Sequence, residues 1–184
     1  HAGRLVIPFN SQDKKKNFVN WIAFSDDGGR SWHRGGNVPQ TDGRQLNEVQ
    51  VAEARDGTLY LNSRRWKGDA FRKDSWSKDG GQTWSAAIEE AAMPDPTCQA
   101  SLLRVDRGAE THFYFLNPAG KGRKDGTLRL STDGGRTWPA SRLVFPGPFA
   151  YSSIAALADG RIGVLYEPAG DTVIKFRAVD PPGR

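Results

Sequence analysis

One octapeptide occurs three times in this chain, and this repeat constrains the fold more than any other feature of the sequence. The copies occupy residues 25–32 (SDDGGRSW), 77–84 (SKDGGQTW) and 131–138 (STDGGRTW), so successive copies begin 52 and 54 residues apart. The paired glycines suit a turn with positive φ, and the aspartate carboxylate can accept backbone N–H bonds across it. We therefore expect each copy to form a hairpin turn with its tryptophan packed beneath.

A second pattern lies between the copies of the octapeptide. Residues 51–61 and residues 154–165 each resemble two strands joined by an Asp-Gly turn, and residues 102–116 are a looser third version. Each unit of about 52 residues thus holds two hairpins, and hence four antiparallel strands. Four-stranded units repeated around an axis are the blades of a β-propeller.

The sequence predicts almost no helix, which agrees with this interpretation. Only residues 85–93 look helical, because they are rich in Ala and Glu, and Pro94 and Pro96 limit that helix to one or two turns. The predicted fold class is therefore all-β. At about 53 residues per blade, the 184 residues correspond to about three and a half blades, with one hairpin in residues 151–180.

The composition excludes several classes of function. No apolar run approaches the roughly 18 residues of a membrane span. The single cysteine, Cys98, rules out a disulfide within the chain, and the three histidines lack metal-ligand spacing, so we expect no metal and no other cofactor. The net charge is +5, but the basic residues are scattered among turns, which argues against nucleic-acid binding. Two or three well-placed arginines would still suffice for a small anionic ligand.

The three octapeptides resemble the Asp-boxes, or bacterial neuraminidase repeats, of the sialidase superfamily. In that family the boxes lie at the blade peripheries and are structural, so the resemblance implies no catalytic role for Asp27, Asp79 or Asp133. Similar boxes occur in sortilin-like receptors, in some glucanases and in other secreted propellers. A propeller that binds glycan or protein without cleaving it is therefore an alternative function.

More specific motifs fall at the predicted blade centres. Residues 47–53 (NEVQVAE), followed by residues 59–64 (LYLNSR), resemble the Asn-Glu-x-Gln-Val-Ala-Glu and Leu-Asn-x-Arg stretch of exo-α-sialidases. In that family the first glutamate pairs with a tyrosine nucleophile, and the arginine belongs to a cluster of three that binds the sialic acid carboxylate. The resemblance assigns these roles to Glu48 and Arg64.

Two further motifs would complete the substrate side of the site. Residues 94–101 (PDPTCQAS) are similar to a Cys-Gln-Gly-Ser segment whose glutamine, Gln99 here, lies near the substrate. Residues 116–123 (LNPAGKGR) resemble the segment that delivers the third cluster arginine, which implies this role for Arg123, with Arg129 as a reserve.

The last two motifs concern the nucleophile and a supporting carboxylate. Residues 149–153 (FAYSS) resemble the nucleophile strand, which makes Tyr151 the candidate nucleophile. Residues 163–167 (GVLYE) resemble the strand whose glutamate supports the first cluster arginine, so Glu167 is expected behind the arginines. All these motifs occur in family order. Taken singly, each residue would be an ordinary core, rim or surface side chain, and only the joint pattern favours a site.

The implied chemistry accounts for these residue types. The reacting carbon of a sialoside carries a carboxylate, so a neutral phenol approaches it without the repulsion that an anionic nucleophile would meet. Tyrosine has a pKa near 10 and needs a base within hydrogen-bond reach, a role that suits Glu48 for Tyr151. The planar guanidinium groups of Arg64 and Arg123 suit a carboxylate ligand.

The resemblance also implies an activity, a cellular location and a size for the whole propeller. It implies a retaining exo-α-sialidase, or a trans-sialidase, acting on sialylated glycans, with a secreted, cell-surface or periplasmic location. Sialidase propellers have six blades, so residues 1–184 would be the C-terminal portion of one such catalytic domain and would pair with an N-terminal half. The family's first cluster arginine and its aspartate acid/base lie in earlier blades and have no counterpart here. We therefore expect residues 1–184 alone to show no measurable turnover.

Overall fold

The computed structural model describes all residues except 1–2, 44, 68–69, 169, 171 and 184, and the described residues form strands and turns without any helix. None of them therefore forms a helix that could cross a membrane. The strands are β1 (Leu5–Gln12), β2 (Phe18–Ser25), β3 (His33–Arg34), β4 (Leu46–Glu53), β5 (Leu59–Arg65), β6 (Ala70–Ser77), β7 (Ile88–Asp95), β8 (Ser101–Arg107), β9 (Glu110–Pro118), β10 (Lys124–Ser131), β11 (Ala140–Pro148), β12 (Ser152–Ala156), β13 (Ile162–Tyr166) and β14 (Lys175–Val179).

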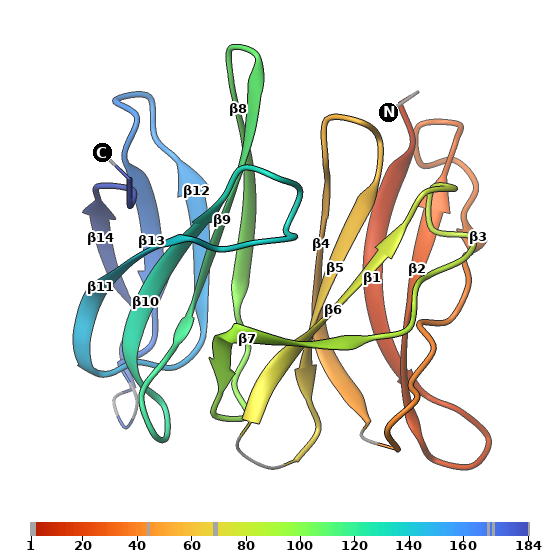
Figure 1. Cartoon of the computed structure of the whole chain (residues 1–184), viewed down its shortest axis with the longest axis horizontal. Coiled ribbons are helices and arrows are strands. Elements are labelled where there is room, and N and C mark those ends of the chain that lie inside the picture. The colour runs from red at the N-terminus through yellow and green to blue at the C-terminus, as the bar shows by residue number, and fades with distance from the viewer. Residues whose placement is uncertain (1–2, 44, 68–69, 169, 171, 184) are drawn as a thin grey trace.

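These strands make four antiparallel sheets that stand side by side in sequence order (Figure 1). The second sheet (β4 to β7) and the third sheet (β8 to β11) have four strands each. The first sheet (β1 to β3) and the fourth sheet (β12 to β14) have three strands each, so the fourth gains a strand beyond the single hairpin expected there. The all-β prediction is confirmed over the described residues, whereas the count of six blades stays a prediction.

The predicted short helix at residues 85–93 is wrong. This stretch instead leads into β7, which pairs with β6 and places Glu90 opposite Arg72 and Pro94 opposite Phe71. Because β7 is the outermost strand of its sheet, it tolerates the proline, which has no N–H for a ladder bond. Pairing with β6 therefore outweighs the helical propensity of alanine and glutamate here.

The three octapeptides form the hairpin turns that the sequence predicts. In the second copy, Ser77 Oγ donates to Asp79 Oδ1 (2.7 Å) and accepts from Gly81 N (2.8 Å). Thr83 donates its N–H and its hydroxyl to the two oxygens of Asp79 (2.9 and 2.6 Å). The other two copies repeat these four bonds. Burial opposes ionisation of Asp79, but the Thr83 and Ser77 hydrogen bonds outweigh it and lower its pKa to about 2.

Each of the last two turns also packs onto the sheet before it. A side chain added at Gly81 would collide with Ile22 of the first sheet, and one at Gly135 would collide with Tyr60 of the second. Trp84 and Trp138 are accordingly 7% exposed each. Trp32 is 43% exposed, because no described sheet precedes its own. The turns therefore join neighbouring sheets as well as closing hairpins, and the expected burial of tryptophan holds for two of the three copies.

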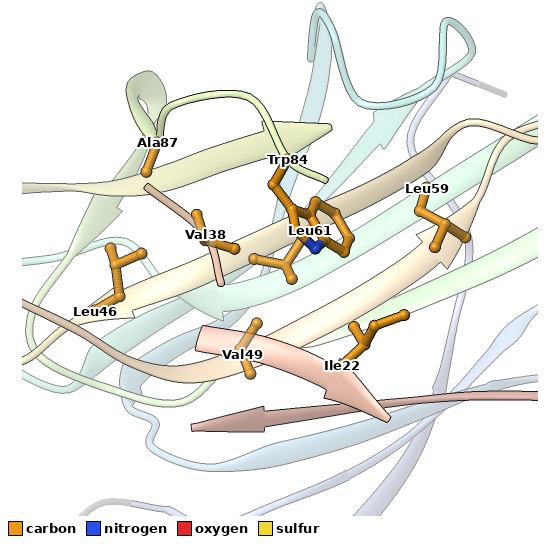
Figure 2. Packing of buried hydrophobic residues seen from close by; sticks show 8 residues of the cluster. All are labelled: Ile22, Val38, Leu46, Val49, Leu59, Leu61, Trp84 and Ala87. Carbon is orange, nitrogen blue, oxygen red and sulfur yellow. The ribbon is translucent and has the colours of Figure 1, made fainter. Parts of the chain in front are cut away.

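Three apolar layers lie between the four sheets. The layer between the first and second sheets is built around Trp84 of the second sheet and Ile22 of the first (Figure 2). The layer between the second and third sheets contains Tyr60 and Phe113, and the layer between the third and fourth contains Phe149 and Tyr166. Removal of this apolar surface from water is what holds successive sheets together.

The first strands of the four sheets lie next to one another. Strand β4 contacts both β1 and β8, and β8 contacts β12. Residues at or just before the beginnings of β4, β8 and β12 can therefore meet, although they are far apart in the chain. The candidate site is built from these strand beginnings.

Candidate active site

Two irregular backbone segments carry the first pair of candidate residues. Strand β4 pairs regularly with β5 from Val49 onward, but between Leu46 and Val49 the register shifts by one residue. Glu48 lies in this irregularity, and such bulges commonly redirect a side chain next to a site. Because β5 runs antiparallel to β4, the end of β5 places Arg64 beside Glu48. Tyr151 comes from the loop immediately before β12 in the fourth sheet.

The three side chains form one hydrogen-bonded cluster. Tyr151 Oη donates to Glu48 Oε1 at 2.5 Å. Arg64 Nη1 donates to Glu48 Oε2 at 2.8 Å and to Tyr151 Oη at 3.2 Å. The Arg64 side chain is 10% exposed and that of Glu48 is 30% exposed, so the cluster is open on one side. The structure thus brings together a phenol and a carboxylate that lie 103 residues apart in the chain.

Electrostatics keep the phenol protonated and the guanidinium charged. Burial, then the hydrogen bond and the charge of Glu48, raise the pKa of Tyr151 above its usual 10.0, while Arg64 and Arg123 oppose the shift. Burial acts to lower the pKa of Arg64, but the hydrogen bond and charge of Glu48 outweigh it and raise that pKa. The Tyr151 oxygen can therefore become a nucleophile only as its proton passes to an acceptor, and Glu48 is the acceptor within reach.

A second cation lies over the tyrosine. Arg123, which directly precedes β10, places its guanidinium carbon 5.4 Å from the centre of the Tyr151 ring. Its Nη2 donates to the Thr97 carbonyl at 3.1 Å, and its side chain is otherwise exposed. The reserve candidate, Arg129, is 5% exposed and donates to the Ala92 carbonyl and to Asn117, outside the cluster. Geometry thus favours Arg123 over Arg129 as the arginine that a ligand could reach.

The other two candidates meet the cluster through the backbone. The Gln99 amide donates to the Ser152 carbonyl and accepts from the Ser152 N–H, at 3.0 Å in each case. Glu167 donates its N–H to the Tyr151 carbonyl at 2.9 Å, while its exposed carboxylate forms no hydrogen bond or ion pair with any described residue. Contact of Gln99 with substrate and support of an arginine by Glu167 stay predictions.

A second cluster of the same residue types was not foreseen from the sequence. Tyr60 Oη and Asn62 Nδ2 both donate to Asp74 Oδ1 at 2.8 Å, and the Arg72 Nε–H donates to Asn62 Oδ1. All four residues are at most 1% exposed. Burial raises the pKa of Asp74 to about 8. The charged residues of β6, an inner strand of the second sheet, were the signal in the sequence. Alternation of polar and apolar residues alone does not show which face of a strand is covered.

The single cysteine is poorly suited to act as a nucleophile. Cys98 is buried, and burial raises the pKa of its thiol to about 11, which makes it a poor nucleophile. Over the described part of the chain, no group of three or more His, Cys, Asp or Glu is arranged to hold a metal ion. The functional groups gathered at the strand beginnings are therefore a phenol, a carboxylate and two guanidinium groups.

Comparisons with known proteins show the family and the fold of the chain. A family model described as a BNR repeat-like domain matches residues 1–164. The sialidase of Micromonospora viridifaciens is 37% identical over 175 residues, which cover 91% of this chain and 26% of the relative. A Hadza microbial sialidase superposes with a TM-score of 0.80 at 32% identity, over 98% of this chain and 35% of that chain. An intramolecular trans-sialidase from Ruminococcus gnavus gives a TM-score of 0.79 at 25% identity, over 98% of this chain and 41% of that chain.

The repeated turns, the row of sheets and the family match define a class of protein, the BNR-repeat proteins with propeller-like sheets. Within that class, the chain belongs to the sialidase superfamily. It spans 26% of the length of the Micromonospora viridifaciens sialidase and 31% of that of the Bacteroides fragilis sialidase, to which it is 34% identical.

Proposed function

We propose that this chain forms the nucleophile side of an exo-α-sialidase active site, in a protein that removes terminal α-linked sialic acids with retention of configuration. The observation that supports the proposal most directly is the 2.5 Å hydrogen bond from Tyr151 Oη to Glu48 Oε1, with Arg64 Nη1 3.2 Å from the same phenolic oxygen. A phenol that has both a base and a cation on its oxygen is suited to attack a carbon that bears a carboxylate.

The first step would form a bond between Tyr151 Oη and the anomeric carbon while the glycosidic C–O bond breaks. The phenolic proton would pass to Glu48, and the leaving oxygen would take a proton from a general acid. Arg64 would stabilise the negative charge that develops on the phenolic oxygen. In the second step water would attack the same carbon and lose a proton to the deprotonated general acid, while the bond to Tyr151 Oη breaks. Glu48 would return the phenolic proton to Tyr151, and the sugar would leave with its original configuration.

The substrate carboxylate would lie against Arg64 and Arg123. Both guanidinium groups are next to Tyr151, and an anion bound between them would hold the anomeric carbon near the phenolic oxygen. We assign the general acid, the first cluster arginine and the remaining blades of a six-bladed propeller to other parts of the protein. On this proposal residues 1–184 alone are inactive, and the exposed Glu167 carboxylate supports the arginine supplied from outside the chain.

A fluorinated sialosyl fluoride tests the proposal in the complete protein. Fluorine next to the reacting carbon slows both steps, while the fluoride leaving group keeps the first step feasible, so a covalent intermediate accumulates. We expect peptide mass spectrometry to place the fluorosialyl group on Tyr151 and a Tyr151→Phe variant to remain unlabelled. An adduct on another residue, or turnover without any adduct on Tyr151, would contradict the proposal.

Transfer instead of hydrolysis is the second candidate, and it is favoured by the likeness to the intramolecular trans-sialidase. Both reactions would use the same nucleophile and differ in the acceptor of the second step. Product analysis distinguishes them, because hydrolysis releases free sialic acid and intramolecular transfer releases an anhydro sugar. A third candidate, glycan binding without cleavage, predicts unchanged function in the Tyr151→Phe variant. A secreted, cell-surface or periplasmic location is proposed from family resemblance.

A further inference from the structure

One short segment is hydrogen-bonded to Arg123 and to the neighbours in sequence of Arg64 and Tyr151. It runs from Asp95 to Ser101 and connects the second sheet to the third. The contacts of this connecting segment go beyond those that a link between two strands requires, and they suggest a function for it.

At its beginning the segment is fixed to the strand that carries Arg64. Asp95 Oδ2 accepts from Arg65 N at 2.8 Å, and its Oδ1 accepts from Cys98 N at 3.3 Å. The carboxylate is fully buried, and Arg72, which donates to the Cys98 carbonyl at 2.9 Å, lies 3.9 Å from it. A buried carboxylate that accepts two backbone N–H groups fixes both of them, because releasing either one would leave a buried polar group unpaired.

The middle of the segment meets Arg123. Thr97 has a φ of 55°, a left-handed conformation that is uncommon for a β-branched residue and persists only where its surroundings impose it. The carbonyl of this residue accepts the hydrogen bond from Arg123 Nη2. The strained conformation thus aims an acceptor at the cation that lies over Tyr151.

The end of the segment holds the backbone next to the proposed nucleophile. Gln99 pairs with both the N–H and the carbonyl of Ser152, as a neighbouring strand would. Ser101 Oγ adds contacts of 2.6 Å to the same carbonyl and 2.8 Å to the Ser152 hydroxyl. Ser152 directly follows Tyr151, so these contacts fix the point from which the phenol extends.

We propose that Gln99 is a positioning residue for Tyr151, and that the segment from Asp95 to Ser101 holds the Arg64, Arg123 and Tyr151 elements in mutual register. This inference rests on the proposed function and deepens it. It gives Gln99 a task that does not require contact with substrate. Because both amide atoms of Gln99 bond to Ser152, which directly follows Tyr151, the proposed effect of Gln99 is on the position of the phenolic oxygen relative to Glu48.

A Gln99→Glu variant of the complete protein tests this role, because it keeps the shape and removes one donor. The ionised carboxylate still accepts from Ser152 N but faces the Ser152 carbonyl without a hydrogen to donate. We expect kcat to fall about ten- to a hundredfold at neutral pH and KM to change by less than about twofold. Gln82→Glu is the matched control, since it makes the same change in an exposed turn.

The pH dependence supplies a signature that general destabilisation would not produce. Protonation of the introduced carboxyl restores a donor toward the Ser152 carbonyl. The ratio of variant kcat to wild-type kcat should therefore rise as the pH falls toward about 4 to 5, where a glutamate carboxyl titrates. The control variant should keep a constant ratio.

Other outcomes overturn the inference. An unchanged kcat, or a raised KM with unchanged kcat, would mean that Gln99 does not act through Tyr151. If Gln99→Glu fails to fold, Ser101→Ala replaces it, and wild-type kcat in that variant contradicts the inference. The proposed function fails separately, by the absence of a Tyr151 adduct in the wild-type protein, whereas a labelled wild type with a fully active Gln99→Glu variant refutes the positioning role alone.

Discussion

Two clusters in this chain contain the same three functional groups, a tyrosine hydroxyl, a carboxylate and a guanidinium. Tyr151 donates to Glu48 at 2.5 Å beside Arg64, at the open edge where strand beginnings meet. Tyr60 donates to Asp74 at 2.8 Å near Arg72, enclosed in the second sheet and its neighbours.

The difference between the clusters lies in exposure. Glu48 keeps 30% of its side chain exposed, whereas Tyr60, Asp74 and Arg72 are at most 1% exposed. A small molecule can approach the first cluster, whereas the second is enclosed by protein. The same groups can therefore serve chemistry in one place and stability in the other, and residue type alone does not distinguish the two uses.

The largest expected effect is the difference in kcat between variants of the two tyrosines. In the complete protein, Tyr151→Phe should lower kcat by about a thousandfold or more, because it removes the oxygen that is proposed to form the covalent bond. Tyr60→Phe makes the same chemical change in the enclosed cluster and should leave kcat within about threefold of wild type. Steady-state kinetics on an activated sialoside measures both variants. Equal losses would show that the clusters do not differ in the way proposed.

The two carboxylates should separate in the same way. Glu48→Gln removes the proposed base and should lower kcat by about a hundredfold or more, since general base catalysis contributes factors of this size. Asp74→Asn should keep most of the wild-type kcat in molecules that remain folded, so activity is normalised to folded protein. Wild-type activity in Glu48→Gln would rule out this carboxylate as the proton acceptor.

The effects of the two tyrosine substitutions on stability should have the opposite order to their effects on activity. Tyr60→Phe leaves buried Asp74 with one donor fewer and should reduce the free energy of unfolding by about 1–3 kcal/mol. Tyr151→Phe, at a partly exposed position, should change it by less than about 1 kcal/mol. Denaturant unfolding of the two variants gives the comparison directly. A larger loss in Tyr151→Phe would mean that the exposed cluster also holds the fold together.

The last prediction concerns a pH dependence of stability that depends on Asp74. Burial raises its folded-state pKa to about 8 from an ordinary 3.8, so the folded protein retains a proton that the unfolded chain releases. The stability contributed by the neutral carboxyl is fully present below pH about 4, declines as the pH rises and is lost above about 8. Asp74→Asn should remove this part of the slope.

The measurement is the thermal midpoint of wild type and variant across that pH range. Asp180→Asn is the matched control, because it removes a carboxylate from an exposed site. The difference between wild type and Asp74→Asn should change with pH, while the difference for the control should not. A constant difference for Asp74→Asn would mean that this carboxyl is ionised in the folded protein.

Much of the local structure could be predicted from the sequence because it depends on neighbouring residues. Turn chemistry at residues 77–84 follows from the spacing of Ser77, Asp79 and Thr83, and all three copies form the same bonds. The helix at residues 85–93 was mispredicted because its propensity is local, whereas the pairing of β7 with β6 is not. Tryptophan burial was likewise predicted uniformly, yet it depends on whether another sheet covers the turn.

The same distinction between local and non-local determinants applies to the candidate site. The sequence by itself determined the turn motifs, the strands and the residue types of the site, since these follow from short patterns and from family resemblance. Family resemblance implied that Glu48 pairs with Tyr151 and favoured Arg123 over Arg129, but only the tertiary structure brings these side chains together and pairs Gln99 with Ser152. These contacts span 28 to 103 residues and depend on how whole sheets pack. Sheet packing also sets exposure and hence pKa, so it separates a partly exposed tyrosine cluster from a buried one.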